Sequence, residues 1–278
     1  MANPIPAESS RQSVTRMQWS SPFPPGISFS GVVEGRADES RAGGGGGVEG
    51  TVNEGAADKN TVEEGAADKI TAASTRRRLL PEERALLPAT VHPRRLLEFT
   101  LGRSCARAAL ASLNPFLWSF PILRTGDRTP CWPVGYVGAI THHKGRAAAA
   151  VARRGDYGGL GLDLEAQRAM SDAMRRRLLR PEERARLEGL PQAEAELRAM
   201  VVFSAKESIY KCLHPVTGVY LGFQDAEVFD LVEVAPERGA LRWRLFKDCG
   251  PRFPAGYEGM GAYVLRPGFV LTGVWVAG

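Results

Sequence analysis

The first 75 residues of this 278-residue chain differ so sharply from the rest that only the rest can build a compact core. Residues 51–60 and 61–70 are nearly identical decapeptides, and they follow an unbroken run of glycine at 43–47. Bulky apolar residues are too sparse in this part to bury a core. We therefore expect residues 1–75 to be a disordered, low-complexity extension, and residues 76–278 to carry the fold and the function.

Residues 160–165 alternate leucine with glycine or an acidic residue, which is the pattern of a β-strand. Successive side chains of a strand point to opposite faces, so Asp163 and Glu165 project from the same face. One hard divalent cation can lie between two carboxylates at that spacing. Taken alone, the stretch is explained equally well by a solvated acidic edge of a sheet.

The segment from Val202 to Leu213 has the period of an amphipathic helix, with Glu207 and Lys211 on its polar face. Their i,i+4 spacing lets them address one ligand or form a surface ion pair. Lys206 falls within the apolar face, where an ammonium group is costly unless its stem snorkels or its charge is paired.

A second helix is predicted over residues 96–113, and its inward line contains Arg103, with Arg107 one turn further on. Guanidinium groups match phosphate oxygens in a planar, bidentate fashion, so the two arginines form a plausible anion clamp. For either residue singly, an ion pair with Glu98 or a loop cap is an equal alternative.

Residues 136–142 are predicted to form a strand, and the alanine-rich run 146–152 its hairpin partner. His142 therefore lies near the turn, beside the hydroxyl of Thr141. A histidine in this position can bind phosphate oxygens, act as a base or ligate a metal, although an isolated histidine is most often structural. The pair His142 and His143 is weak support for zinc, because adjacent strand side chains point apart.

In this order, the motifs resemble those of the 4′-phosphopantetheinyl transferase superfamily, in its branch associated with siderophore (enterobactin synthase) and other nonribosomal peptide synthesis. The family's Gly-Ile-Asp-Ile-Glu strand resembles residues 161–165, its Ile-Ser/Thr-His turn residues 140–142, and its Trp-x-x-Lys-Glu-Ser-x-x-Lys helix residues 203–211. The segments 95–107 and 130–133 resemble the first helix of this branch and the segment before its histidine strand. Three positions depart from the family pattern, namely Phe203 for Trp, Ala139 for Ser and His143 for Cys.

The resemblance implies an α+β fold of two similar α/β halves in a pseudo-twofold arrangement, with the active site between them. We place the halves near residues 76–158 and 159–278. An internal echo fits this plan, because residues 76–85 resemble residues 175–185, although a bias toward Arg and Leu can also produce it.

The resemblance also implies a reaction, in which the phosphopantetheine arm of coenzyme A is moved onto a serine of an acyl or peptidyl carrier protein and adenosine 3′,5′-bisphosphate is released. Mg²⁺ would be held by Asp163 and Glu207, with Glu165 as a further ligand or close neighbour. Glu207 is favoured as the acceptor of the serine proton, with Glu165 as the alternative. Lys206 would neutralise the carboxylates. Lys211 is implied as a catalytic residue together with Glu207 and Glu165. Cofactor-binding roles are implied for Arg95, Arg103, Thr141, His142, Lys206 and Lys211. Lysines that bind adenine in relatives have no counterpart at 81–84, so base recognition is unassigned.

Charge and cysteine content limit which partners and which cellular setting we expect. The first 75 residues hold 6 basic and 10 acidic residues, so of the overall +5 the remainder carries about +9. A basic catalytic region attracts an acidic carrier protein or a polyanionic cofactor, and no nucleic-acid-binding motif is present. The four cysteines show no paired spacing, which predicts a reduced, cytoplasmic setting without structural zinc. We expect no signal peptide or membrane span, and a monomer.

Two other classes of protein share parts of this pattern. A noncatalytic module could bind coenzyme A or an acidic protein through a basic face, but it would not need three converging carboxylates. A metal-dependent phosphohydrolase shares the carboxylate and lysine chemistry, and it would consume coenzyme A without a carrier protein.

Overall fold

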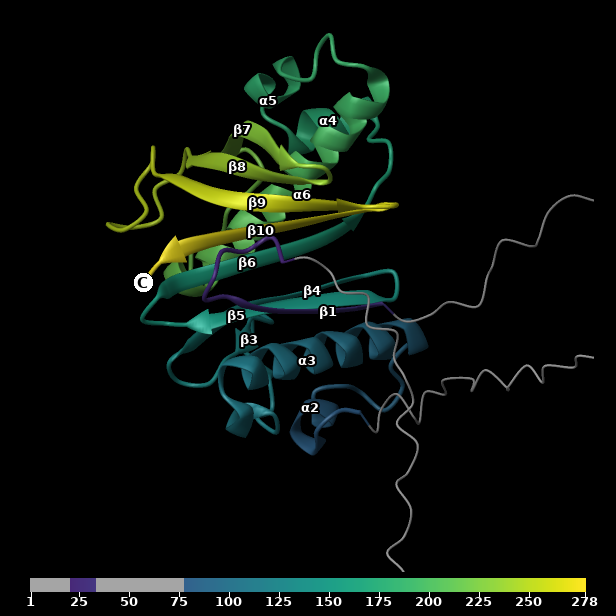
Figure 1. Cartoon of the computed structure of the whole chain (residues 1–278), viewed down its shortest axis with the longest axis vertical. Coiled ribbons are helices and arrows are strands. Elements are labelled where there is room, and N and C mark those ends of the chain that lie inside the picture. The colour runs from purple at the N-terminus through teal and green to yellow at the C-terminus, as the bar shows by residue number, and fades with distance from the viewer. Residues whose placement is uncertain (1–20, 34–77) are drawn as a thin grey trace, which may run out of the picture.

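The computed structural model of the chain describes residues 21–33 and 78–278. Two sheets, each with one long helix against it, lie one above the other in Figure 1. This arrangement confirms the predicted α+β fold of two halves. None of the described helices is long and apolar enough to span a bilayer.

The lower half is a three-stranded antiparallel sheet in the order β1-β5-β4, packed on helix α3. Its elements are β1 (Ser28–Val33), α2 (Pro81–Ala85), α3 (Pro93–Leu113), the 3-10 turn η1 (Pro115–Leu117), β2 (Leu123–Arg124), β3 (Pro130–Cys131), β4 (Tyr136–His143) and β5 (Arg146–Arg153).

The upper half is a five-stranded antiparallel sheet in the order β6-β10-β9-β8-β7, crossed by helix α6. Its elements are β6 (Tyr157–Ala166), α4 (Asp172–Leu178), α5 (Pro181–Ala185), α6 (Gln192–Thr217), β7 (Ala226–Ala235), β8 (Arg238–Leu245), β9 (Glu258–Arg266) and β10 (Phe269–Ala277). Gly218 ends α6 in the left-handed conformation, which suits a glycine at this position.

Strand β5 is buried on both faces, which explains why it reads as a continuous apolar run rather than an alternating one. Ala147, Ala149 and Val151 pack into the core under α3, whereas Ala148 and Ala150 face a second core. That second core also takes leucines of β6, so it joins the two halves. Small side chains on β5 therefore let a helix and the other sheet approach from opposite sides.

Strands β4 and β6 lie side by side where the halves meet, and this junction places the strand motifs 140–142 and 161–165 on one seam. The hydroxyl oxygen of Thr141 on β4 accepts a hydrogen bond from the backbone N–H of Leu164 on β6, at 3.1 Å. Across the same strand, Gly161 lies directly against α6: an added Cβ would fall 1.8 Å from the carbonyl oxygen of Ser208. Glycine at 161 therefore lets β6 approach α6 closely.

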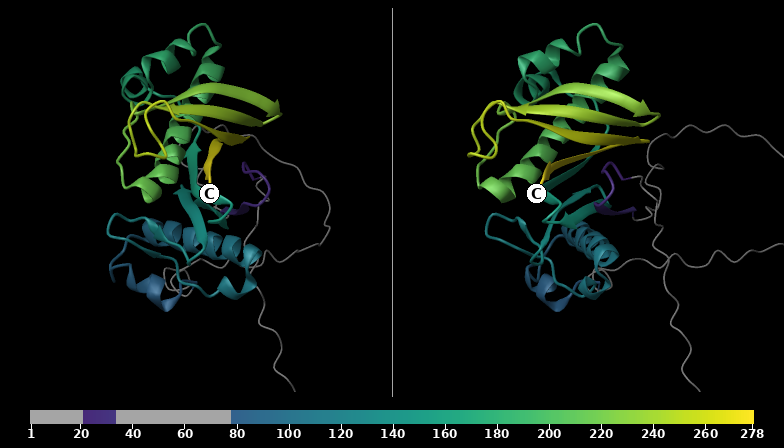
Figure 2. Two further views of the ribbon diagram at one scale, coloured as in Figure 1. Left: turned by 90° about the vertical axis from the view of Figure 1, so that its left-hand side faces the viewer. Right: turned by 60° about the vertical axis from the view of Figure 1, so that its left-hand side comes forward.

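Residues 21–33 differ from the expectation of a disordered extension over 1–75. Residues 28–33 form β1, which pairs with β5 along its whole length, and Phe23 and Ile27 are buried in the core that joins the halves. Figure 2 shows this purple segment on the side of the sheets away from α6. The composition of residues 1–75 did not indicate this strand. One short apolar segment is enough to form a strand when the strand that it pairs with lies elsewhere in the chain. The other residues of the predicted extension lie outside the described part.

The internal echo in the sequence corresponds to two equivalent short helices, α2 and α5, each with the sequence Pro-Glu-Glu-Arg-Ala. The second glutamate of each, Glu83 and Glu183, is almost fully buried. Glu83 accepts hydrogen bonds from the backbone N–H groups of Leu80 and Ile122, and it pairs with Arg107. The repeated motif thus anchors a short helix to the body of its half.

Glu183 makes the same contacts in the upper half. It accepts from the backbone N–H groups of Arg180 (2.7 Å) and Val228 (2.7 Å), and it pairs with Lys206 at 2.6 Å. The two halves therefore share a buried carboxylate network as well as a sequence motif.

Candidate active site

Asp163 lies at the seam between the halves, on β6, and only 3% of its surface is exposed. Its Oδ1 is 2.6 Å from Nζ of Lys211, and its Oδ2 accepts a hydrogen bond from Ser204 at 2.9 Å. Both partners come from α6, which β6 can approach because of Gly161. The predicted strand and helix therefore meet as expected, with the carboxylate held between them.

A chain of hydroxyl groups leads from Asp163 toward β10. Ser204 Oγ lies 2.9 Å from Thr272 Oγ1 on β10, and Ser208 Oγ lies 2.8 Å from the same atom. These three residues were not singled out from the sequence. Ser204 and Ser208 are four residues apart, on the polar face of α6 with Glu207, and this spacing is the signal that could have found them.

Glu165 and Glu207 flank Asp163. Burial raises the pKa of Glu165 to about 7, and the neighbouring charges of Asp163 and Glu207 add to the effect. Burial, and then Asp163, also raises the pKa of Glu207. Negative charge is therefore concentrated in a poorly solvated place, and Lys211 opposes it for both residues.

This charge distribution fits a divalent cation, although the side chains do not form a closed ligand set. Among the described residues, no three His, Cys, Asp or Glu side chains converge as ligands of one ion. Carboxylate oxygens are nevertheless the donors that hard divalent cations prefer, and a cation relieves the repulsion that raises the pKa of Glu165. Asp163, Glu165 and Glu207 are the residues that would hold it.

His142 ends a second cluster of charged groups on the lower half. Its Nε2 lies 3.1 Å from Nη1 of Arg95, and its Nδ1 lies 3.4 Å from Oε2 of Glu98, both on α3. Burial lowers the pKa of His142, Glu98 raises it, and Arg95 and Lys211 lower it again. Lys211, which pairs with Asp163, is thus among the charges that act on His142.

Arg103 is buried and forms no ion pair with another described residue. It is 6% exposed, its guanidinium lies over the ring of Phe99 at 4.4 Å, and its Nε has no hydrogen-bond partner among the described residues. Burial lowers the pKa of Arg103 to about 10, despite the opposing charge of Glu83. Arg124, Arg95 and Arg107 lower it further. An anion would satisfy both the unpaired Nε and the excess of positive charge.

Two residues take positions that the sequence interpretation did not foresee. Lys206 does not neutralise the Asp163 group, because its Nζ pairs with Glu183 and donates to the carbonyls of Leu178 and Phe223. The ammonium group is thus saturated by protein partners. Arg107 is not half of an anion clamp, since its guanidinium pairs with Glu83.

Thr141 is 3% exposed, and its hydroxyl oxygen links β4 to Leu164 of β6. The structure thus gives this residue a part in joining the halves. Its predicted contact with a phosphate stays a prediction. His143, on the opposite face of β4 from His142, lies 3.5 Å from Glu165 through Nδ1.

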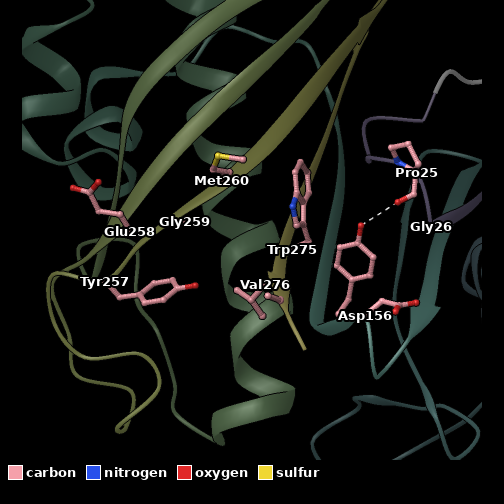
Figure 3. Close-up of a pocket in the computed structure, with 11 residues that line it drawn as sticks. Pro25, Gly26, Asp156, Tyr257, Glu258, Gly259, Met260, Trp275 and Val276 are labelled. Atoms are coloured by element: carbon pink, nitrogen blue, oxygen red, sulfur yellow. Dashed lines mark hydrogen bonds between the residues drawn. The ribbon is translucent and has the colours of Figure 1, made fainter.

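Two hollows of about 200 Å³ border the seam. One is lined by Ile140, Lys211 and His214, together with the β2–β3 loop, and the other by Glu207, Tyr210 and neighbouring residues. A larger open groove of about 590 Å³ lies elsewhere, between Pro25, Met260 and Trp275 (Figure 3). Its lining includes neither His142 nor any of the three carboxylates, so it is not the site described above.

Comparison with known proteins agrees with this division of the chain. The model of the 4′-phosphopantetheinyl transferase N-terminal domain matches residues 82–152, and that of the 4′-phosphopantetheinyl transferase superfamily matches residues 159–253.

Curated relatives carry the same name. The chain is 38% identical over 203 residues to 4′-phosphopantetheinyl transferase Svp of Streptomyces mobaraensis, covering 72% of this chain and 79% of the relative. It is 37% identical to PptT of Mycobacterium tuberculosis over 149 residues, 54% of this chain and 64% of that protein. Npt of Nocardia iowensis is 34% identical over 163 residues, 57% and 70% of the two chains. This chain therefore belongs to the 4′-phosphopantetheinyl transferase superfamily, and it is a transferase that moves phosphopantetheine onto carrier proteins.

Proposed function

We propose that this chain takes the 4′-phosphopantetheine group from coenzyme A, attaches it to a serine of an acyl or peptidyl carrier protein with Mg²⁺ as the metal, and releases adenosine 3′,5′-bisphosphate. Members of the superfamily use coenzyme A and are generally dependent on a divalent metal ion. The observation that carries the proposal is that one half holds a buried guanidinium, Arg103, whose Nε has no partner among the described residues, while the other half holds a crowded group of carboxylates.

The cationic side of the seam suits the nucleotide end of the donor. Arg103 offers an N–H that has no partner among the described residues, while Arg95 is exposed and can turn toward a phosphate. His142 lies between Arg95 and the seam. Together they supply donors for phosphate oxygens. Lys211, with its ammonium partly exposed beside Asp163, is the natural contact for the pyrophosphate.

The carboxylate side suits a metal ion and a proton acceptor. When bound, Mg²⁺ would neutralise charge that develops on the pyrophosphate during transfer. Asp163, Glu165 and Glu207 are its ligands in this proposal. Glu207 accepts the serine proton, and Glu165, whose pKa of about 7 suits a base near neutral pH, is the alternative.

The partner and setting are also part of the proposal. The carrier protein is acidic, because residues 76–278 carry about +9 of net charge. We assign it to nonribosomal peptide synthesis, including siderophores, from the likeness of residues 95–107 and 130–133 to that branch. The protein acts as a monomer, since one chain supplies both sides of the seam, and it acts in the cytoplasm, in keeping with four cysteines that form no disulfide in the described residues.

Intact-protein mass spectrometry tests the reaction. An apo carrier protein is incubated with coenzyme A, Mg²⁺ and the full chain, alongside Glu207→Gln and Glu165→Gln. The matched control is Glu233→Gln, an exposed carboxylate on β7, the strand farthest from β6 in its sheet. We expect a metal-dependent gain of one phosphopantetheine mass with wild type and control, and loss with Glu207→Gln.

Two results would contradict the proposal. Consumption of coenzyme A without a carrier protein would identify a phosphohydrolase. Intact coenzyme A and no mass gain across several acyl and peptidyl carriers would favour a binding module.

A further inference from the structure

The ring of His142 is held in one tautomer. Arginine has donors only, so Nε2 must accept the hydrogen bond from Nη1 of Arg95 at 3.1 Å. A neutral imidazole carries one proton, which therefore lies on Nδ1, facing Oε2 of Glu98 at 3.4 Å. Both ring nitrogens therefore face charged side chains of α3.

This tautomer cannot donate a hydrogen bond to a phosphate. The Nε2 atom presents a lone pair, and phosphate oxygens are acceptors too. A contact between Nε2 and a phosphate needs two changes: the Arg95 guanidinium must leave Nε2, and Nε2 must gain a proton. The neutral ring and a phosphate-bound ring are therefore different protonation states.

Glu98 is the group that can balance the second state. It is 9% exposed, and it holds Nε of Arg94 at 3.0 Å with its other oxygen. The charged groups facing the ring are Glu98 and Arg95 on α3, and Lys211 on α6. Glu98 is the one anion among them, so it is the internal partner of a charged imidazolium.

We propose that binding of a nucleotide phosphate at His142 takes up one proton on Nε2, and that Glu98 is the positioning residue that orients the ring and balances the resulting charge. The inference rests on the proposed function, since it assumes that a phosphate of the donor reaches this cluster. The Arg95–Nε2 hydrogen bond breaks, a proton from solvent bonds to Nε2, and the new N–H donates to a phosphate oxygen. The freed guanidinium of Arg95 turns to the same phosphate, and no bond of the ligand is cleaved.

Isothermal titration calorimetry of the full chain with adenosine 3′,5′-bisphosphate tests the proton count. Titrations at one pH, in buffers of different ionisation enthalpy, give the number of protons exchanged on binding. His142→Gln reports the exchange due to the ligand's own phosphates. We expect wild type to take up about one proton more than His142→Gln, and its affinity to fall with rising pH by up to about tenfold per unit.

Variants of Glu98 separate positioning from packing. Glu98→Gln keeps an acceptor for Nδ1–H but removes the charge, so we expect a smaller proton uptake and weaker binding. Glu98→Asp keeps the charge and should restore the uptake even if it lowers stability. Arg94→Gln removes the other partner of Glu98 and serves as the matched control, with the uptake unchanged.

Nitrogen-15 NMR of the histidine ring gives a direct readout. Free protein should show His142 protonated on Nδ1 alone, and the nucleotide complex should show both nitrogens protonated. Equal proton counts in wild type and His142→Gln, with both binding the nucleotide, would overturn the inference and leave the proposed function standing. Failure of wild type to bind the nucleotide would overturn the proposed function itself, and the inference with it.

Discussion

The two halves use the same buried carboxylate network and surround it with opposite charge. Glu83 and Glu183 occupy equivalent positions in equal helices, and each accepts two backbone N–H groups and one cationic side chain. Around Glu83 lie further arginines, and their repulsion adds to the burial that lowers the pKa of Arg103. In the upper half, Glu207 follows Lys206 on α6, and Asp163 and Glu165 lie on β6. The charges of Asp163 and Glu207 add to the burial that raises the pKa of Glu165.

The comparison shows that one repeated frame can carry opposite local charge in its two halves. The network holds the short helix against the body of each half, whereas the residues just outside it set the sign of the local charge. In the proposed function, phosphates and a divalent cation are drawn to the seam from opposite sides. The halves therefore share their construction while differing in charge.

The largest expected effect is a loss of stability. It tests whether Glu83 and Glu183 depend equally on their cationic partners, Arg107 and Lys206. Lys206→Met leaves Glu183 buried without a charge partner, and we expect a loss of about 3–5 kcal/mol in the free energy of unfolding. Arg107→Met should cost less, because Arg103 is close enough to Glu83 to compensate it. Urea denaturation of both variants measures the difference. Equal losses would show that the surplus arginines do not support Glu83.

Next in size is the loss of transfer when the carboxylate group is broken. Asp163→Asn removes the charge that faces Lys211 but retains an oxygen for Ser204, so the fold should survive. We expect transfer to a carrier protein to fall at least about 100-fold, as when a preorganised charge at a reacting centre is removed. Mass spectrometry of the carrier over time measures the rate, with Glu233→Gln as the control. Near-normal transfer would remove Asp163 from the metal site.

A smaller effect, of opposite sign, is expected for Glu165→Gln in metal-free protein. The folded pKa of Glu165, about 7, lies above the usual value of 4.5, so the folded state binds its proton more tightly. The stability due to this group is present at low pH and is lost as pH rises from about 4.5 to about 7. At pH 8 the variant should be more stable than wild type, by up to about 3 kcal/mol, and at pH 4 it should show no gain.

Thermal unfolding in the presence of a chelator, at both pH values, checks this prediction. Excess Mg²⁺ should reverse the order, because it stabilises the wild-type carboxylates more than the variant. A variant less stable than wild type at pH 8 without metal would show that burial and the neighbouring charges do not disfavour the ionised form of Glu165.

The smallest expected effect concerns His142 in the cationic half. Burial, together with Arg95 and Lys211, holds its folded pKa below the usual 6.5. The unfolded chain then binds the proton more tightly, so stability should fall as pH drops below about 6.5. His142→Gln should flatten this part of the profile, as measured by denaturation between pH 5 and pH 8. An unchanged profile would show that the pKa of His142 is not lowered in the folded protein.

Local patterns predicted the elements that carry the site, because the relevant periods are short. The strands at 136–142, 146–152 and 160–165 and the helices over 96–113 and 202–213 all formed, within longer elements in most cases. Strand and helix periods placed Asp163 with Glu165 on one strand face and Glu207 with Lys211 on one helix face, and the family resemblance joined these two faces in one site.

Pairings across the chain could not be predicted in that way. Lys206 was correctly identified as unusual, but its partner Glu183 lies on a different helix, and nothing in the local period names it. The same holds for Arg107 with Glu83, and for Thr272 beneath Asp163. Such contacts depend on which elements pack together, and that is decided by the whole fold.

Strand β1 has a consequence for how the molecule is assembled. It is synthesised before every other described element, yet the strand that it pairs with ends at Arg153, and Tyr157 donates its hydroxyl to the carbonyl of Pro25, 132 positions earlier. Contacts across so long a loop form slowly, because the loop must close before they contribute. A nascent chain therefore carries Phe23 and Ile27 uncovered until much of the protein has left the ribosome, which offers chaperones an early binding site.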